Sequence, residues 1–312
     1  MGKIITIANQ KGGVGKTTTT VNLAACIAAL EHKVLLIDID PQSNATSALG
    51  FDKSEPHIST YDILIGTSAA QESVRDTALS FLKLMPSDIN LVGAEVELVE
   101  MEKRESLLRD AIAQIKNDFE YVMIDCPPSL GLLTVNALVA ADSVLVPVQT
   151  EYFALEGLGQ LLNTISMVKR NLNSGLELEG VLLTMFDSRL KLSNQVVDEV
   201  RRYFDQRVFR TVIGRNVRLS EAQSFGKPII LYDAASLGAK HYMELAKEFL
   251  DRKKARVKHD QVGSKQPVDA ETVTPKDESD ITSPQDTERL SQEKDAEGRN
   301  IQSKTSREDA KL

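Results

Sequence analysis

The sequence predicts an α/β fold in which a twisted, mostly parallel sheet has helices on both faces. Short, continuously apolar segments alternate along the chain with longer segments whose apolar residues recur at helical spacing. Continuously apolar strands are typical of parallel sheets that are buried on both faces. A glycine-rich turn follows the first apolar segment, and two later segments end in aspartate, as expected where a sheet binds a ligand at the carboxyl ends of its strands.

The apolar segments give the expected order of elements. Five of them predict buried strands, over Ile4–Ala8, Val34–Asp38, Tyr121–Asp125, Ser143–Val148 and Gly180–Phe186. Helical spacing predicts helices between them, over Thr17–Leu30, Glu95–Lys116, Leu130–Ala141, Leu155–Arg170 and Leu192–Phe204. Later in the chain we expect two further strands and a closing helix, over Phe209–Ile213, Pro228–Tyr232 and Leu237–Phe249.

The composition of the chain changes near residue 250, just after its last aromatic residue, Phe249. Residues 251–312 contain 13 Lys and Arg against 14 Asp and Glu, with few large apolar residues. A segment of this kind cannot bury enough apolar surface to offset its conformational entropy, so we expect it to be disordered. The predicted organisation is therefore one folded domain over residues 1–250 and a charged tail over residues 251–312.

Composition also limits where the protein works and what it binds. Two cysteines, Cys26 and Cys126, are too few for a disulfide framework, which favours a reducing cytoplasm. No apolar segment approaches the length of about 18 residues that a membrane span needs, and no signal peptide is evident. The formal net charge of −8 means that any contact with DNA must come from a local basic patch, or from two patches brought together in an oligomer.

The glycine-rich turn has the features of a phosphate-binding loop. It lies between the first strand and the first helix, where its glycines let backbone N–H groups converge on phosphate oxygens and the helix N-terminus adds positive charge. Lys16 is expected to contact the β- and γ-phosphates of a nucleotide, and the Thr17 hydroxyl to bind Mg²⁺. The usual loop has glycine where Gln10 stands, and a second lysine follows it. The residues expected to bind nucleotide here are Lys11, Gly12, Gly13, Val14, Gly15, Lys16, Thr17 and Thr18.

Three aspartates follow strands that should end beside this loop. Alternation along the strand places Asp38 and Asp40 on one side, and Asp125 ends four apolar residues. A carboxylate after such a strand typically holds Mg²⁺ directly or through water. We therefore expect Thr17 and Asp125 at the metal and the pair Asp38 and Asp40 where metal and water are handled, with the alternative that Asp38 or Asp40 caps the next segment.

Three motifs occur together: Lys11–Thr17 (KGGVGKT), Asp38–Thr46 (DIDPQSNAT) and Asp125–Pro128 (DCPP). Together they closely resemble the ParA/Soj family of chromosome- and plasmid-partitioning ATPases, in the deviant Walker A (MinD-like) branch of P-loop NTPases. The resemblance runs from Lys3 to about Phe249, and the tail has no counterpart in the family. It implies a P-loop ATPase domain that uses ATP and Mg²⁺.

The resemblance implies a role for each of these residues. Lys11 matches the signature lysine, which reaches across an ATP-dependent homodimer to the phosphates bound by the partner subunit. Gly12 stays small because two loops approach closely where the subunits meet. Asp40 matches the carboxylate that positions or activates water, and Asp38 a switch carboxylate near the metal. The catalytic residues implied are therefore Lys11, Lys16 and Asp40.

The resemblance also identifies a loop expected to bind adenine. The segment around Gly214, Arg215 and Asn216 matches the family's adenine-pocket loop. Many members have proline where Gly214 stands, so we expect a looser wall here. Gln223 and Phe225 also differ from the commoner residues.

Family members bind DNA without sequence preference when they are ATP-bound and dimeric. Arg189 and Arg218 match the arginines that make this contact. Further basic residues lie near them in sequence and are expected to widen the patch, namely Lys191, Arg201, Arg202, Arg207, Arg210, Arg215 and Lys227. The alternative for each is ordinary solvated surface charge.

The function implied is a cytoplasmic, nucleoid-associated switch. ATP closes a homodimer, the dimer binds DNA, and a partner of the ParB/Spo0J type stimulates hydrolysis, which drives partitioning. A related ATPase that positions another cargo would share every nucleotide residue and is the main alternative. A MinD-like membrane switch would need a basic amphipathic C-terminal helix with large apolar residues, of which the tail has almost none, so no membrane partner is expected.

Overall fold

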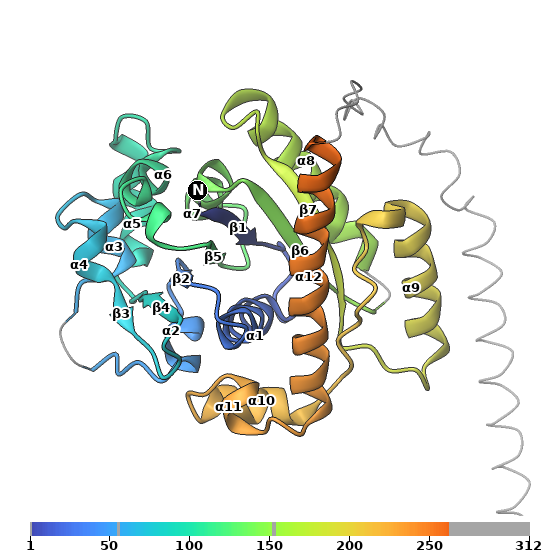
Figure 1. The fold of residues 1–312 in the computed structure, drawn as a ribbon. Coiled ribbons are helices and arrows are strands. Elements are labelled where there is room, and N and C mark those ends of the chain that lie inside the picture. The colour runs from blue at the N-terminus through green and yellow to red at the C-terminus, as the bar shows by residue number, and fades with distance from the viewer. Residues whose placement is uncertain (1, 55–56, 152–153, 262–312) are drawn as a thin grey trace, which may run out of the picture. The chain divides into compact units, whose positions relative to one another are not determined.

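The computed structural model describes residues 2–54, 57–151 and 154–261. The chain divides into two units, Met1–Val257 and Lys258–Leu312, and the first holds a seven-stranded sheet. The strand order is β3-β4-β2-β5-β1-β6-β7, and all neighbours are parallel except β3 and β4 (Figure 1). The predicted α/β class with a mostly parallel sheet is therefore confirmed.

The strands are short, as expected of a buried parallel sheet. They are β1 (Lys3–Ile7), β2 (Val34–Asp38), β3 (Arg75–Asp76), β4 (Leu82–Met85), β5 (Tyr121–Asp125), β6 (Ser143–Gln149) and β7 (Glu177–Thr184). The five buried strands predicted first are all present, with shifts of a few residues at their ends. The sequence analysis missed β3 and β4, which form one edge of the sheet.

Helices and 3₁₀ turns connect the strands. They are α1 (Lys16–Ala29), α2 (Asn44–Ala48), α3 (Thr60–Leu64), α4 (Ala70–Ser73), α5 (Leu91–Glu97), η1 (Leu98–Glu100), α6 (Leu107–Ile112), η2 (Lys116–Asp118), α7 (Leu132–Ala140), α8 (Ala154–Asn171), α9 (Lys191–Phe204), η3 (Asp205–Arg207), α10 (Val217–Ser224), α11 (Ile229–Tyr232) and α12 (Leu237–Gln261). The helices predicted over the segments of α1, α7, α8 and α9 are confirmed. Among the described residues, no helix combines the length and the apolar character needed to cross a membrane.

The closing helix, α12, begins where predicted and continues past residue 250. Arg252 helps to hold this extension, because its guanidinium lies 2.8 Å from a carboxylate oxygen of Glu248 and over the ring of Phe209. Residues 262–312 lie outside the described residues, so the division into a domain and a tail stays a prediction.

Two predicted strands are wrong. Phe209–Ile213 runs beside β7 without forming a strand, because the carboxylate of Glu248 accepts hydrogen bonds from the backbone N–H groups of Arg210 and Thr211. Pro228–Tyr232 contains a helical turn, α11, in which the Tyr232 N–H donates to the Pro228 carbonyl. Proline favours such a start, since its fixed φ suits the first turn of a helix.

The helix predicted over Glu95–Lys116 is also wrong as a single element. It is broken into α5, η1, α6 and η2. Met101 is extended and Lys103 has a positive φ of 54°, so the chain turns between η1 and α6. Arg104 donates from its guanidinium to the Val99 carbonyl across this turn. The apolar spacing continued through the turn, which is why the pattern suggested one helix.

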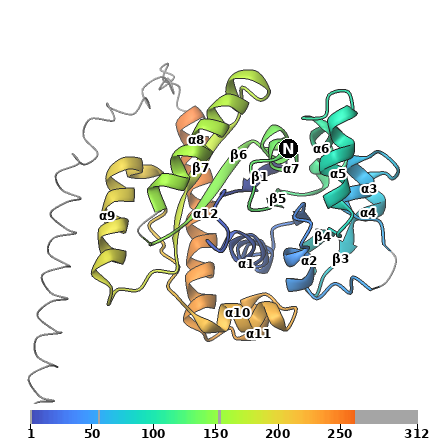
Figure 2. The same ribbon diagram turned by 180° about the vertical axis from the view of Figure 1, so that it is seen from behind.

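The two faces of the sheet are covered by two separate apolar clusters. Alternate strand residues such as Ile5 and Leu36 pack with α1 and α12 on one face, and residues such as Ile4 and Leu35 pack with α5–α9 on the other (Figures 1 and 2). Side chains alternate between faces along each strand, so a strand buried on both faces is apolar at most positions.

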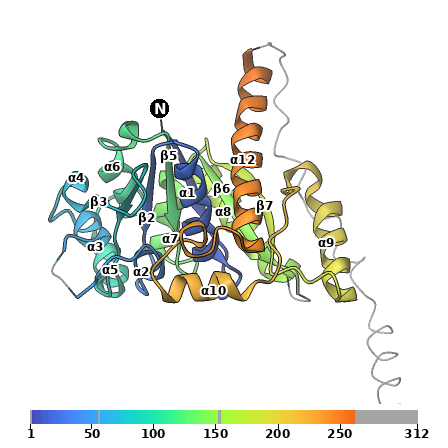
Figure 3. The ribbon, with the colours of Figure 1, turned by 60° about the horizontal axis from the view of Figure 1, so that its bottom comes forward.

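The loops that carry the predicted site leave the sheet from neighbouring strands. Strand β1 lies between β5 and β6, and β2 lies on the far side of β5. Open α/β sheets bind ligands where connections diverge from neighbouring strands, outside the carboxyl ends. Figure 3 shows α2 and α10 together at this edge, where they contact each other.

Candidate nucleotide-binding and catalytic site

The predicted phosphate loop joins β1 to α1. Gly13 and Gly15 have φ values of 73° and 87°, a backbone region that favours glycine. A Cβ added at Gly13 would meet no atom within 4 Å, so this side of the loop is open. The loop lines a cleft of about 550 Å³, whose other walls come from α2, α10 and the segments after β2, β5 and β7. The cleft has room for bound phosphates.

Lys16, the lysine expected at the phosphates, is buried at the start of α1. Its Nζ donates to the backbone carbonyl of Lys11 at 3.3 Å. Burial lowers the pKa of Lys16, and the nearby carboxylates of Asp125 and Asp40 oppose this shift. A buried ammonium needs negative partners, so this position suits a residue that binds phosphate.

Asp125 ends β5 directly behind the loop. Its two carboxylate oxygens accept hydrogen bonds from the hydroxyls of Thr17 and Thr20, each at 2.7 Å. Asp38 is its neighbour in the register of β2 and β5. Burial raises the pKa of Asp125, and the adjacent Asp38 raises it further. A carboxylate and a hydroxyl therefore meet behind the loop, with Asp38 on the neighbouring strand, and oxygen atoms are the ligands that Mg²⁺ prefers.

Asp38 is the last residue of β2, and Asp40 lies in the loop that follows. Asp38 Oδ2 accepts hydrogen bonds from the hydroxyl and the N–H of Thr46, at 2.7 and 2.8 Å. Burial raises the pKa of Asp38, and these hydrogen bonds oppose the shift. Asp40 lines the cleft and accepts from the Gln42 N–H at 2.9 Å. Asp40 thus serves the local backbone and also lines the cleft, whereas Asp38 is buried and accepts from the first turn of α2, so the capping alternative is partly correct.

Sequence reasoning missed three residues that support these carboxylates. Thr20 and Thr46 supply the hydroxyls described above, and Ser87 donates to the Asp40 carbonyl at 2.5 Å. Thr20 lies three residues after Thr17 on the same helix face, a spacing that would have indicated its role. Ser87 follows β4, a strand that was itself not predicted, so no sequence signal placed it here.

Comparison with known proteins identifies the family. Residues 2–178 match the family model described as an AAA domain. Over 248 residues the chain is 57% identical to the sporulation initiation inhibitor protein Soj of Bacillus subtilis, covering 80% of this chain and 98% of that protein. It is 54% identical over 252 residues to the chromosome partitioning protein ParA of Myxococcus xanthus, covering 81% and 89%.

The chain belongs to the ParA/Soj family of partitioning ATPases.

Solved structures share the fold of this ParA/Soj chain. A Mycobacterium smegmatis protein, described as cobyrinic acid a,c-diamide synthase with bound ADP and magnesium, is 37% identical with a TM-score of 0.70, covering 86% of this chain and 98% of that one. A plasmid partition protein from Borrelia burgdorferi is 25% identical with a TM-score of 0.63, covering 82% and 99%. Since their names indicate different activities, fold likeness alone cannot assign the cargo.

The family's adenine-pocket loop lines a second cavity beside the cleft. This cavity, of about 240 Å³, includes Gly214, Asn216 and Tyr242 and shares Gly15, Thr18, Met185 and Ser220 with the cleft. The Asn216 side chain accepts from the Arg218 N–H and caps α10. Gln223 donates to the Thr18 hydroxyl at 3.0 Å, which ties α10 to the phosphate loop. The structure thus brings the predicted adenine residues next to the predicted phosphate residues.

Lys11, which matches the signature lysine, lies at the rim of the site. Its Nζ lies 3.6 Å from a carboxylate oxygen of Glu151, and its side chain is 35% exposed. Glu151 also lies 3.7 Å from the guanidinium of Arg215. Sequence reasoning missed Glu151, because it joins residues far apart in the chain. The two loop lysines therefore occupy different places, one inside the loop and one facing outward.

The predicted DNA-contacting arginines follow two segments that run side by side, with Arg189 in the loop after β7 and Arg218 in the first turn of α10. Hydrogen bonds join them, since the Phe186 N–H donates to the Ile213 carbonyl and the Arg215 N–H to the Phe186 carbonyl. Arg189 and Arg218 follow this junction, with side chains 85% and 55% exposed. The other basic residues named for this patch are also exposed: Lys191, Arg201, Arg202, Arg207, Arg210, Arg215 and Lys227.

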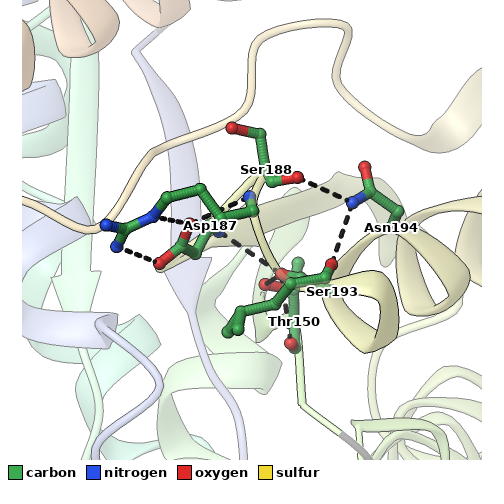
Figure 4. Close-up of polar contacts among 7 residues, drawn as sticks. Thr150, Asp187, Ser188, Ser193 and Asn194 are labelled. Carbon is green, nitrogen blue, oxygen red and sulfur yellow. Dashed lines mark hydrogen bonds and ion pairs between the residues drawn. The ribbon is translucent and has the colours of Figure 1, made fainter.

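Arg189 is held by a carboxylate of its own loop. Its guanidinium donates to both oxygens of Asp187, at 2.9 and 2.6 Å, and these bonds lower the pKa of Asp187 to about 2. The loop is anchored because the Asp187 N–H donates to Ser193 Oγ, which lies 2.6 Å from Thr150 Oγ1 (Figure 4). Asn194 donates to the Ser188 carbonyl in the same view. Arg189 is therefore presented on a well-anchored loop.

Arg218 is paired as well, with carboxylate oxygens of Glu221 at 2.8 Å and Asp233 at 3.7 Å. Exposed ion pairs of this kind contribute little to stability, so a phosphate can replace the carboxylate at small cost. The geometry is thus compatible both with DNA contact and with ordinary surface charge.

Proposed function

We propose that this chain is a Mg-ATP-dependent switch that dimerises on ATP, binds DNA without sequence preference and hydrolyses ATP to drive partitioning. One observation carries the proposal. Lys16 is buried in the phosphate loop, whereas Lys11 lies at the rim, partly exposed and paired with Glu151. A lysine so placed suits a role toward a second subunit.

Each group of site residues has a separate role in ATP binding and hydrolysis in this proposal. The N–H groups of residues 12–18 and the ammonium of Lys16 would hold the phosphates, and Asp125 and Asp38 would hold Mg²⁺ together with Thr17. When bound, Mg²⁺ supplies positive charge to the phosphate oxygens. Asp40, at the cleft wall, orients the attacking water. Lys11 of each subunit adds positive charge to the partner's site, as arginine fingers do in other P-loop enzymes.

DNA binding follows from dimerisation in this proposal. A single patch around Arg189 and Arg218 must work against the chain's net charge of −8. A dimer brings two patches to one DNA, and their contacts with phosphate add. The bidentate bonds from Arg189 to Asp187 hold the guanidinium on its loop until a phosphate competes for it. We infer a nucleoid-associated protein in the cytoplasm.

We infer the partner and the cargo from the family to which the chain belongs. We propose that a ParB/Spo0J-type protein stimulates hydrolysis, so that the dimer leaves DNA where its partner is concentrated. The name of the Myxococcus xanthus relative, chromosome partitioning protein ParA, favours a chromosome as cargo. Positioning of another cargo would use the same nucleotide residues and would differ only in its partner.

The test is DNA binding measured with ATP, with ADP and without nucleotide, each at two salt concentrations. We expect binding with ATP only. We also expect affinity to fall with salt, with a log–log slope of about −0.9 for each phosphate contacted. Equal binding in all three nucleotide states would contradict the switch.

A further inference from the structure

One face of the first turns of α12 packs against the adenine-pocket loop. Gly238, His241 and Tyr242 are three and four residues apart, so they share this face of the helix. Tyr242 is buried and lines the cavity of about 240 Å³ beside the cleft, with its hydroxyl 3.3 Å from Thr19 Oγ1. The sequence predicts only a closing helix here, yet this face of the helix reaches the nucleotide site.

The helix lies close to the loop because position 238 is glycine. A Cβ there would lie 2.9 Å from Leu219 Cγ and 3.4 Å from Asn216 Nδ2. Carbon atoms in favourable contact are about 3.5–4.0 Å apart, so a larger residue would push α12 away from the start of α10. The two helices lie next to each other at this point (Figures 1 and 3). The backbone of α12 therefore packs directly on the residues that follow the loop.

His241 makes a polar contact between α12 and the loop. The Gly214 N–H donates to His241 Nδ1 at 3.3 Å. Because the amide is the donor, Nδ1 must be unprotonated, and the neutral imidazole has its proton on Nε2. The ring also lies against the loop, since a Cβ added at Gly214 would be 3.3 Å from His241 Cε1. The imidazole therefore holds the Gly214 backbone both by a hydrogen bond and by packing.

The residues on either side of Gly214 are held by a different element. The Arg215 N–H donates to the Phe186 carbonyl at 3.0 Å, and the Ile213 carbonyl accepts from the Phe186 N–H at 3.1 Å. The segment after β7 thus fixes one side of the loop, and His241 fixes the other. Without the imidazole, the Gly214 N–H would lose its acceptor, and the loop would be held from one side only.

We propose that His241 is a positioning residue for the nucleotide base. It fixes the Gly214 backbone so that the loop and its cavity have the shape of the bound state before ATP arrives. A loop that is already ordered pays less conformational entropy on binding, so the affinity is higher. The inference rests on the proposed function, in which this loop binds the base. The phosphates bind at Lys16, so His241 should affect only the affinity that the base contributes.

The test compares ATP with inorganic triphosphate, which has the phosphates and no base, by calorimetry on the full chain with Mg²⁺. His241→Leu removes the acceptor and keeps a side chain of similar size, and it should weaken ATP binding about ten-fold. His241→Asn places an amide oxygen near the position of Nδ1 and should restore most of the affinity. Both variants should bind triphosphate like the wild type. Lys240→Leu, at the exposed neighbouring position, is the control and should bind both ligands normally.

Gly214→Ala tests the same contact from the loop. Its methyl group would press on the imidazole, so we expect weaker binding of ATP and unchanged binding of triphosphate. Unchanged ATP affinity in His241→Leu, or an asparagine variant no better than the leucine variant, would overturn the inference. Equal losses for ATP and triphosphate would also overturn it, because they would show a general effect on the fold.

The wild type separates this inference from the proposed function. If it binds ATP no more tightly than triphosphate, the base site of the proposed function is wrong, and the role of His241 falls with it. If it prefers ATP and His241→Leu keeps that preference, the base site stands and only the role of His241 is wrong. Loss of DNA binding would leave both results unchanged.

Discussion

Replacing Thr46 by valine removes one hydroxyl from the hydrogen bonds around Asp38. That hydroxyl donates to Asp38 Oδ2 at 2.7 Å and accepts from the Ser87 N–H at 3.0 Å, and all three groups are buried. A hydrogen bond to a charged group contributes about 1.5–3 kcal/mol, and a buried donor left without a partner costs about 1–3 kcal/mol. We expect Thr46→Val to lower the free energy of unfolding by about 3 kcal/mol at pH 8.

The loss should depend on pH with a definite sign. The Thr46 bonds lower the pKa of Asp38 against the rise that burial causes, so their removal raises that pKa further. The penalty on the ionised carboxylate is present above the folded-state pKa and is lost as the pH falls through it. The deficit of Thr46→Val should therefore be largest at pH 8 and should have shrunk at pH 5, below the pKa of about 6 that Asp38 has in the folded wild type.

The assay is urea unfolding at pH 8 and at pH 5, without metal, for the wild type, Thr46→Val and Thr46→Ser. Serine keeps the hydroxyl and loses one methyl group, so we expect a loss near 1 kcal/mol at both pH values. Equal losses for valine and serine, or a valine deficit that grows at low pH, would refute the role assigned to the Thr46 hydroxyl.

Three further substitutions test the site. Lys16→Ala should weaken ATP binding roughly a hundred-fold, measured by calorimetry, because a charge-assisted bond to phosphate is lost; undiminished affinity would contradict the phosphate-loop assignment. Asp40→Ala should slow hydrolysis by about 10²–10⁴-fold and leave an ATP-bound dimer in gel filtration; only monomer with ATP would contradict this. Arg189→Glu with Arg218→Glu should abolish DNA binding in gel shifts and keep ATP-dependent dimerisation; retained DNA binding would place the patch elsewhere.

The phosphate loop and the central strands were predictable because their signals are local. KGGVGKT needs glycines at fixed positions, and strands buried on both faces are nearly continuous apolar segments. Both signals can be read from residues that are neighbours in the chain. Asp38 and Asp125 could be brought together in advance because parallel strands end at one edge of the sheet.

The errors arose where distant residues decide the structure. The Glu248 carboxylate accepts hydrogen bonds from the backbone N–H groups of Arg210 and Thr211. No pattern within Phe209–Ile213 indicates these bonds. The pairing of Lys11 with Glu151 likewise joins the first and the sixth strand connections. β4 was missed because only four residues pair and one of them, Lys83, is polar. Long-range contacts of this kind override local propensity.

The central claim is that Lys11 acts on the neighbouring subunit rather than on its own nucleotide. The direct measurement compares the wild type with Lys11→Ala for ATP affinity, by calorimetry, and for dimerisation with ATP, by gel filtration with light scattering. We predict that Lys11→Ala binds ATP with nearly wild-type affinity and fails to form the ATP-dependent dimer or to hydrolyse ATP. A variant that dimerises and hydrolyses like the wild type, or one that loses ATP binding as a monomer, would contradict the account.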